Sequence, residues 1–214
     1  MAITDYGELK TAVADWLQRD DLTAAIPDFI ALAEDRIRQD ERLRIRPMEA
    51  TADLTVSAQE VALPTRFVSA RRIYLDGTPL KRLEFLAPEN FWIRNLATQT
   101  GTPKFFTIEG ENFVFGPAPD TTYTGKLLYY QSFAALSSDP DTNWILTNAR
   151  GLLLYGALIE ASPYLQDDPR ALTWATLWDD LVNKVHDADM RDRYDGAPLQ
   201  ARSDVQVDTS INNR

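Results

Sequence analysis

The sequence contains no cysteine and only 1 histidine among its 214 residues. The absence of cysteine excludes disulfides, thiolate zinc sites, iron–sulfur ligation and a cysteine nucleophile. A single imidazole leaves little room for histidine-based metal binding or proton transfer. Basic residues are scarce too, since 22 Lys and Arg stand against 32 Asp and Glu and leave a net charge of −10. Such a surface disfavours a protein whose main task is to grip nucleic acid in a basic groove.

Long apolar runs are also missing. No stretch approaches the roughly 20 apolar residues of a membrane span, and residues 1–5 lack the basic and apolar regions of a signal peptide. We therefore expect a protein made in the cytoplasm that has no contact with a membrane. No glycine-rich phosphate loop, nucleophile elbow or HExxH motif occurs. The chain does contain 44% hydrophobic residues, which suffice for the core of one domain, with or without an inserted module.

Two amphipathic helices are predicted near the N-terminus. Apolar side chains recur at helical spacing over residues 5–18, with Thr4 as the expected N-cap, and a second helix is expected to begin at Pro27. The stripe of the second helix consists of Ile26, Phe29, Ile30, Ala33 and Ile37. Its other face has mixed charge, and we expect this face to meet solvent or a neighbouring subunit.

From about Pro47 the apolar period changes to two, which is typical of strands. Strand-like runs occupy residues 54–56, 61–63, 67–75, 105–108, 113–115 and 126–131. Turn residues such as Asp76-Gly77 separate them, and one short helix is expected over residues 88–98. The pattern indicates an antiparallel sheet or small sandwich inserted between helical parts.

After Pro140 the pattern returns to helix. One very apolar helix is expected from Trp144 until Ser162-Pro163 stops it, and a last helix of about 27 residues is expected between Asp168-Pro169 and Gly196. The stripe of the last helix consists of Trp174, Trp178, Leu181, Val185 and Ala188. No helical stripe follows Gly196, so we expect an extended tail that orders on a partner.

These elements predict an α+β fold. N-terminal helices (1–46) and C-terminal helices (137–195) would form a helical bundle, with a β-rich inserted domain (47–136) and an extended C-terminal tail (196–214). The charge is unevenly distributed, because residues 137–195 hold 11 acids and 5 bases, a net charge of −6. More than half of the excess negative charge therefore lies on the last helical pair.

Candidate catalytic groups have simpler structural interpretations. His186 lies beside Asp187 and Asp189, but residues one and three positions away on a helix make at best a partial metal site, so we expect an exposed histidine. Adjacent acidic pairs are explained by helix caps and dipoles. These pairs are Asp20-Asp21, Asp167-Asp168 and Asp179-Asp180. We therefore predict no catalytic residues, metal ligands or cofactors.

Tryptophans and arginines offer two further possibilities. The five tryptophans can serve as stacking platforms for sugars or bases, but four lie on helical apolar stripes, where core positions are more common. A run of arginines from Arg36 to Arg46 is interleaved with acids, which fits an interface of salt bridges better than a DNA contact. We expect Arg36, Arg38 and Arg42 at a subunit interface.

Several short motifs occur along residues 5–195. The motifs include Asp20-Asp21-Leu22, Ile26-Pro27-Asp28-Phe29, Leu63-Pro64, Ile73-Tyr74-Leu75-Asp76-Gly77, Gly101-Thr102-Pro103, Phe115-Gly116-Pro117-Ala118-Pro119-Asp120 and Leu152-Leu153-Leu154-Tyr155-Gly156-Ala157-Leu158. In their order and spacing they resemble the phage head-to-tail adaptor (connector) proteins, the tail tubular protein A-like family of short-tailed phages. The resemblance implies a helical bundle carrying a β domain, without catalytic residues. It also implies a ring, dodecameric in similar proteins, that joins the portal protein to the tail nozzle protein at the head–tail junction of the virion.

This resemblance gives the acidic helices and the tail expected roles. DNA would pass through the ring as non-specific cargo, and negative side chains repel phosphates without specific contacts. We expect Asp179, Asp187, Asp189 and Asp192 to line the channel or its mouth. Sparse apolar residues in the neutral tail suggest docking into the portal or an adjacent subunit. The tail residues expected to dock are Leu199, Arg202, Val205, Val207 and Ile211.

Two other readings remain open at this point. The chain can be another phage tail or baseplate protein whose β domain binds a receptor or carbohydrate, which exposed tryptophans would favour. An enzyme ranks third, and carboxylates converging in a pocket would revive that interpretation.

Overall fold

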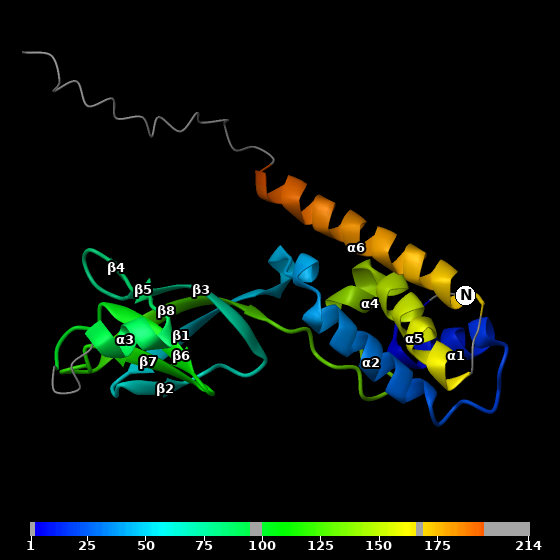
Figure 1. The fold of residues 1–214 in the computed structure, drawn as a ribbon, viewed down its shortest axis with the longest axis horizontal. Coiled ribbons are helices and arrows are strands. Elements are labelled where there is room, and N and C mark those ends of the chain that lie inside the picture. The colour runs from blue at the N-terminus through cyan, green and yellow to red at the C-terminus, as the bar shows by residue number, and fades with distance from the viewer. Residues whose placement is uncertain (1–2, 95–99, 166–168, 195–214) are drawn as a thin grey trace, which may run out of the picture.

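The computed structural model describes residues 3–94, 100–165 and 169–194. This part of the chain has the predicted α+β structure, with a helical part at one end and a β sandwich at the other (Figure 1). The helices are α1 (Tyr6–Leu17), α2 (Ile26–Gln39), α3 (Pro88–Arg94), α4 (Trp144–Asn148), α5 (Arg150–Tyr164) and α6 (Ala171–Tyr194), with two 3₁₀ helices, η1 (Glu41–Leu43) and η2 (Arg46–Met48). The strands are β1 (Glu49–Val56), β2 (Glu60–Ala62), β3 (Phe67–Leu75), β4 (Lys81–Arg82), β5 (Glu84–Phe85), β6 (Phe105–Glu109), β7 (Asn112–Gly116) and β8 (Tyr123–Gln131).

The helical part packs α1, α2, α4 and α6 around α5. The stripe predicted for α2 is confirmed, because its five apolar residues are all buried. On α5, Leu152, Leu153, Ala157 and Leu158 are buried on several sides of the helix, as expected for a central element with little polar face. A continuous apolar core therefore holds helices from both ends of the chain together.

The sandwich consists of two four-stranded sheets, in the orders β1-β8-β3-β4 and β2-β7-β6-β5. A second apolar core lies between them and contains Phe106, Phe113, Phe115 and Leu127. The strands pair antiparallel as predicted, except that β5 pairs parallel with β6, which makes the second sheet mixed. Helix α3 packs on the outer side of β6, where the ring of Phe91 lies edge-on to that of Phe105 at 5.4 Å.

The N-cap of α1 differs from the prediction. Asp5, not Thr4, caps the helix, because its carboxylate accepts a hydrogen bond from the Glu8 N–H at 2.9 Å. Thr4 instead donates its N–H and its hydroxyl to the Glu8 carboxylate, each at 2.7 Å. Asp5 and Glu8 thus make one half of a capping box, while the returning bond to the Glu8 carboxylate comes from Thr4, one residue before the N-cap.

The apolar helix predicted from Trp144 is two helices. Ala149 has non-helical angles (φ −141°, ψ 43°) and separates α4 from α5. The predicted stop at Ser162-Pro163 is also wrong, because α5 continues to Tyr164. A proline this close to the helix end removes one backbone donor, and the N–H of Leu165 still closes the last turn on the carbonyls of Ala161 and Ser162.

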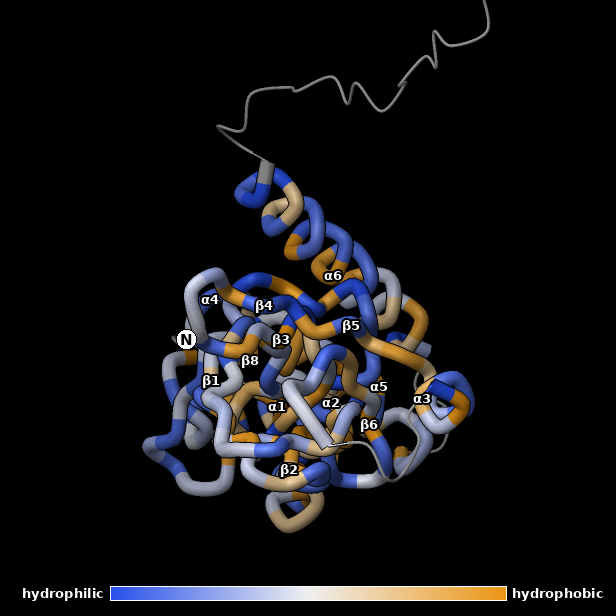
Figure 2. The backbone as a smooth tube through the Cα atoms, turned by 90° about the vertical axis from the view of Figure 1, so that its left-hand side faces the viewer, coloured by the Kyte–Doolittle hydropathy of each residue, from blue (hydrophilic) through white to orange (hydrophobic). Residues whose placement is uncertain are grey.

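Most of the apolar stripe predicted for α6 is confirmed. Trp174 and Trp178 are 4% and 6% exposed, Leu181 and Val185 are partly buried, and Ala188 is exposed, so the stripe does not reach that far. The helix has 24 residues, and Asp168 and Gly196, its predicted limits, lie outside the described residues. Figure 2 shows hydrophobic residues recurring among hydrophilic ones along α6. The domain boundaries at residues 46, 136 and 195 stay a prediction.

Candidate assembly surfaces

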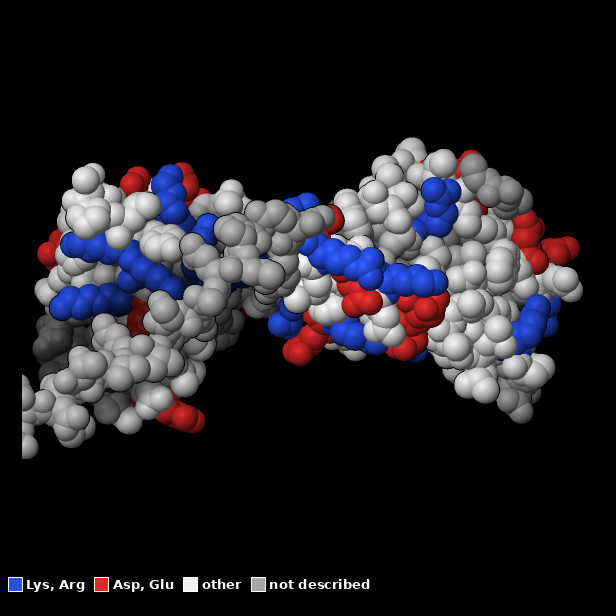
Figure 3. Space-filling view, turned by 90° about the horizontal axis from the view of Figure 1, so that it is seen from above, with Lys and Arg blue, Asp and Glu red and all other residues white. Residues whose placement is uncertain are grey.

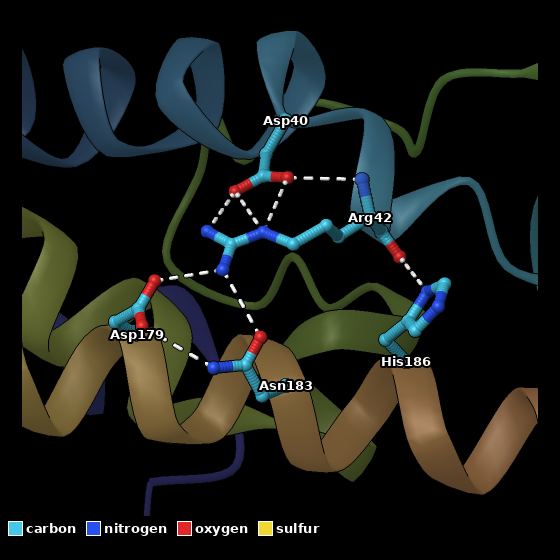
Figure 4. Close-up of polar contacts among 5 residues, drawn as sticks. All are labelled: Asp40, Arg42, Asp179, Asn183 and His186. Atoms are coloured by element: carbon cyan, nitrogen blue, oxygen red, sulfur yellow. Dashed lines mark hydrogen bonds and ion pairs between the residues drawn. The ribbon is translucent and has the colours of Figure 1, made fainter.

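Two arginines after α2, Arg42 and Arg46, contact α6 of the same chain. Arg42 lies in η1, and its guanidinium bonds both the Asp40 carboxylate, at 2.7 Å, and the Asp179 carboxylate on α6, at 2.7 Å (Figure 4). The same guanidinium donates to the Asn183 side-chain oxygen at 3.0 Å, and the Arg42 carbonyl oxygen lies 3.0 Å from Nδ1 of His186. One residue thus ties the end of α2 to two turns of α6.

Asp40 shapes this contact electrostatically. Its carboxylate accepts hydrogen bonds from the Arg42 side chain and from the Arg42 backbone N–H, and the side-chain bonds are the main cause of a lowered Asp40 pKa. The Asp40 side chain is 15% exposed, whereas those of Arg42 and Asp179 are 39% and 56% exposed. Solvent therefore screens the Arg42–Asp179 pair. We expect the pair to fix the orientation of α6 against η1 more than it adds to the stability of the fold.

A second contact joins the end of α6 to the sandwich. Arg193 donates to Asp189 at 2.6 Å and lies 3.2 Å from the Glu49 carboxylate at the start of β1. Arg71 on β3 also pairs with Glu49. The side chains of Arg193 and Asp189 are only 19% and 10% exposed, so this cluster is better shielded than the Arg42 contact.

Three of the four aspartates predicted to line a DNA channel have arginine partners in the same chain. Asp179 pairs with Arg42, Asp189 with Arg193, and Asp192 lies 3.8 Å from Arg46. Within the described residues, Asp187 has no ion pair. Figure 3 shows acidic and basic side chains interleaved over α6 and basic side chains gathered over the sandwich end. The channel role of these aspartates stays a prediction, and pairing reduces their repulsion of phosphate.

The arginines predicted at a subunit interface are also satisfied internally. Arg36 bonds Glu160 on α5 at 2.5 Å, Arg38 pairs with Asp35 at 2.9 Å, and Arg42 makes the contacts described above. Their interface role stays a prediction, and any neighbour would have to add to existing ion pairs. The predicted docking residues of the tail lie outside the described residues, namely Leu199, Arg202, Val205, Val207 and Ile211.

Two expectations about single residues were wrong. His186 is half-buried, because α6 packs against η1 and places the imidazole on the Arg42 carbonyl. The assignment of stripe tryptophans to the core holds for Trp174 and Trp178, but Trp16 and Trp92 are 44% and 46% exposed. Each has a contact at the surface: Trp16 meets the Tyr155 ring, and Trp92 donates its indole N–H to Glu109 at 2.6 Å.

Large apolar side chains on the surface are the feature that sequence analysis missed. Ile93 on α3 and Leu172 on α6 are each 78% exposed, and Phe85 on β5 is 57% exposed. No period-two pattern marks β4 or β5, because each strand is only two residues long. Such residues on both parts of the molecule are typical of surfaces that become covered in an assembly.

No group of three or more His, Asp or Glu among the described residues is arranged to hold a metal ion. No helix in the described part of the chain is long and apolar enough to span a membrane.

A comparison with known families decides the identity. The family model described as SU10 adaptor protein matches residues 4–202, which include both the helical part and the sandwich. The chain belongs to the SU10 adaptor protein family. It is thus a phage adaptor, a structural protein of the virion that works with portal and tail components. Comparison with curated proteins gives no match. The finer likeness of this adaptor to tail tubular protein A stays a prediction.

Proposed function

We propose that this adaptor forms a ring, most simply a dodecamer, that joins the portal protein to the tail nozzle protein and encloses part of the DNA channel. The family match over residues 4–202 carries the proposal, because it covers both parts of the fold. The exposed apolar residues on both parts support it, since a protein placed between two partners and between copies of itself needs several contact surfaces. In this proposal the chain is made in the host cytoplasm and functions at the head–tail junction.

The tail beyond Gly196 is the proposed docking element of the ring. Its apolar residues are sparse and its net charge is zero, a composition suited to a segment that orders on a partner, either the portal or an adjacent subunit. Deleting residues 197–214 should leave the unfolding midpoint unchanged and abolish co-sedimentation with portal particles. Unchanged co-sedimentation of the truncated protein would count against this role.

The acidic helices are proposed to line the channel or its mouth. Asp187 is the strongest candidate, since its carboxylate is exposed and has no ion pair in the described part of the chain, whereas Asp179, Asp189 and Asp192 have arginine partners. A map of the assembled ring tests the idea, and all four aspartates facing outward would refute it. The same map would show whether Arg36, Arg38 and Arg42 lie between subunits.

A receptor- or carbohydrate-binding β domain is the second candidate. The exposed ring of Trp92 on α3 favours it, because exposed aromatic rings are common in sugar sites. The indole N–H is already bonded to Glu109, however, and the ring packs against Phe91 at 5.2 Å. A glycan array with the Trp92→Ala variant as control distinguishes the candidates, since only the second predicts glycan binding that depends on Trp92.

A further inference from the structure

The sandwich has an open side between its two sheets. β4 pairs with β3 only at Tyr74 and Leu75, so residues 67–72 of β3 have a strand neighbour on the β8 side alone. On the facing sheet, β5 pairs with β6 only at Phe105 and Phe106, which leaves residues 107–109 with a neighbour in β7 alone. A groove of about 400 Å³ lies between these two open edges.

The floor of the groove is apolar. It includes Phe67, Ala70, Phe106 and Ile108, and the Phe85 ring stands at its side, edge-on to Phe106 at 5.5 Å. Phe85 is 57% exposed although it touches the sandwich core. Sheets usually cover such an edge with a further strand, a helix or a loop, because open edges and apolar side chains invite pairing with other chains. The groove therefore has the features of a site that lacks one strand.

The rim of the groove is basic. Arg71, Arg72 and Arg82 line it, and Arg71 is paired with Glu49. Arg72 lies over the Tyr74 ring at 5.6 Å, and neither Arg72 nor Arg82 has a carboxylate partner within the described residues. A strand that fits the groove should thus present apolar side chains on one face and acidic or polar side chains on the other.

Residues 204–211 of this chain have that pattern. Their sequence is Asp204-Val205-Gln206-Val207-Asp208-Thr209-Ser210-Ile211. Strict alternation places two valines, a threonine and an isoleucine on one face, and two aspartates, a glutamine and a serine on the other. The segment contains neither glycine nor proline, which would weaken a strand. Its apolar face matches the floor of the groove, and its aspartates match the arginine rim.

The symmetry of a ring favours a second copy as the acceptor. Arg193, next to the last described residue, is held at the start of β1 by Glu49, so the described chain ends at the junction of the helical part and the sandwich. Residues 195–203 can span about 30 Å when extended, which suffices to reach a neighbouring subunit. Each copy carries both a donor segment and an acceptor groove, so such contacts would link copies head to tail, the symmetry that a ring requires.

We propose that residues 204–211 of one copy add as a strand to the open edge of β3 in a second copy, with their valines on the apolar floor. The inference rests on the proposed ring and specifies its subunit contact. β3 has bulges at Val68 and Arg71, where its register with β8 shifts, so main-chain pairing is expected mainly at Ser69 and Ala70. Side-chain packing supplies the rest, as in other cases of strand addition.

The lack of cysteine makes a cross-linking test unambiguous. A Ser69→Cys variant is mixed with a Val207→Cys variant carrying a tag of different size, under mild oxidation, with and without portal particles. Because a disulfide requires Cα atoms about 4.4–6.8 Å apart, Val205→Cys and Thr209→Cys variants are included to cover the other registers. The matched control replaces Ser69→Cys by Thr55→Cys, an exposed position on β1 outside the groove.

Mixed-size dimers about tenfold above the control are expected, since strand addition gives the thiols a high effective concentration. A peptide of residues 203–212 should suppress them, and so should Phe85→Ser, which removes a largely exposed ring from the side of the groove and should lower the unfolding midpoint only slightly. A double variant, Ser69→Cys/Val207→Cys, that cross-links only within one chain would overturn the proposal. Mixed-dimer yields no higher than the control, both with and without portal particles, would overturn it too. Portal attachment of the unmodified protein is measured separately, so that a failure of the proposed ring can be distinguished from a failure of strand addition.

Discussion

Gly156 lies at the close contact between α5 and α2, and its replacement by alanine tests how the helical core is packed. A Cβ atom at Gly156 would lie 2.9 Å from Cβ and 3.6 Å from Cα of Ala33. Ala33 is fully buried, and its Cβ cannot rotate away, so the two helices would have to separate. Overpacking of this kind costs about 1–3 kcal/mol, and the better helix propensity of alanine returns up to about 1 kcal/mol. We expect Gly156→Ala to lower the free energy of unfolding by about 1–2 kcal/mol.

Gly151, on the same helix, provides the matched control. A Cβ atom there would lie 2.6 Å from Cδ1 of Leu181, the far end of a partly buried side chain that can change rotamer. Gly151→Ala should therefore be neutral or gain up to about 1 kcal/mol. Urea unfolding followed by far-UV circular dichroism measures both variants. A Gly156→Ala protein as stable as Gly151→Ala would refute the packing described for α2 and α5.

Three further perturbations test the electrostatics and the surface. Burial raises the pKa of Glu34, so the folded protein binds a proton at this carboxyl more tightly than the unfolded chain does. As the pH falls from 7 through this raised pKa towards 4.5, the unmodified protein should therefore gain stability relative to Glu34→Gln. An equal pH dependence of the two unfolding midpoints would contradict this. Arg193→Met should cost about 1–3 kcal/mol, because it leaves the shielded Asp189 carboxylate without its ion-pair partner and with only the hydrogen bond from the Arg46 N–H. The same change should speed hydrogen exchange in the last turns of α6, and unchanged exchange would argue against the cluster. Acrylamide should quench part of the tryptophan fluorescence, and a Trp16→Phe/Trp92→Phe double variant should lose that part, whereas unaltered quenching would place accessible rings elsewhere.

The sequence predicts those parts of the fold that local patterns control. Pro27 and a 3.6-residue period locate α2, and period-two runs bounded by Asp76-Gly77 locate β3. The break at Ala149 has no such signal, because alanine is a good helix former and tertiary packing decides its angles. Local sequence also says nothing about β4 and β5, which are too short to show a period.

The candidate surfaces are harder to predict because they depend on how helices cross. The acidity of α6 is evident in the sequence, but the partners of Asp179 and Asp192 come from a segment more than 130 residues earlier, as in the Arg42–Asp179 pair. The crossing of α6 over η1 adds these distant pairs to the two pairs within α6, Lys184–Asp180 and Arg193–Asp189. The groove likewise arises from strands that end early on two different sheets, whereas the alternation in residues 204–211 is visible in the sequence.

The most direct test of the proposed role is electron microscopy of the purified full-length protein mixed with portal particles. Our account predicts a ring of additional density at the portal vertex, with one copy of the chain for each portal subunit and an open channel along the axis. Portal particles that remain bare at saturating protein, or that bind the protein without ring symmetry, would contradict it.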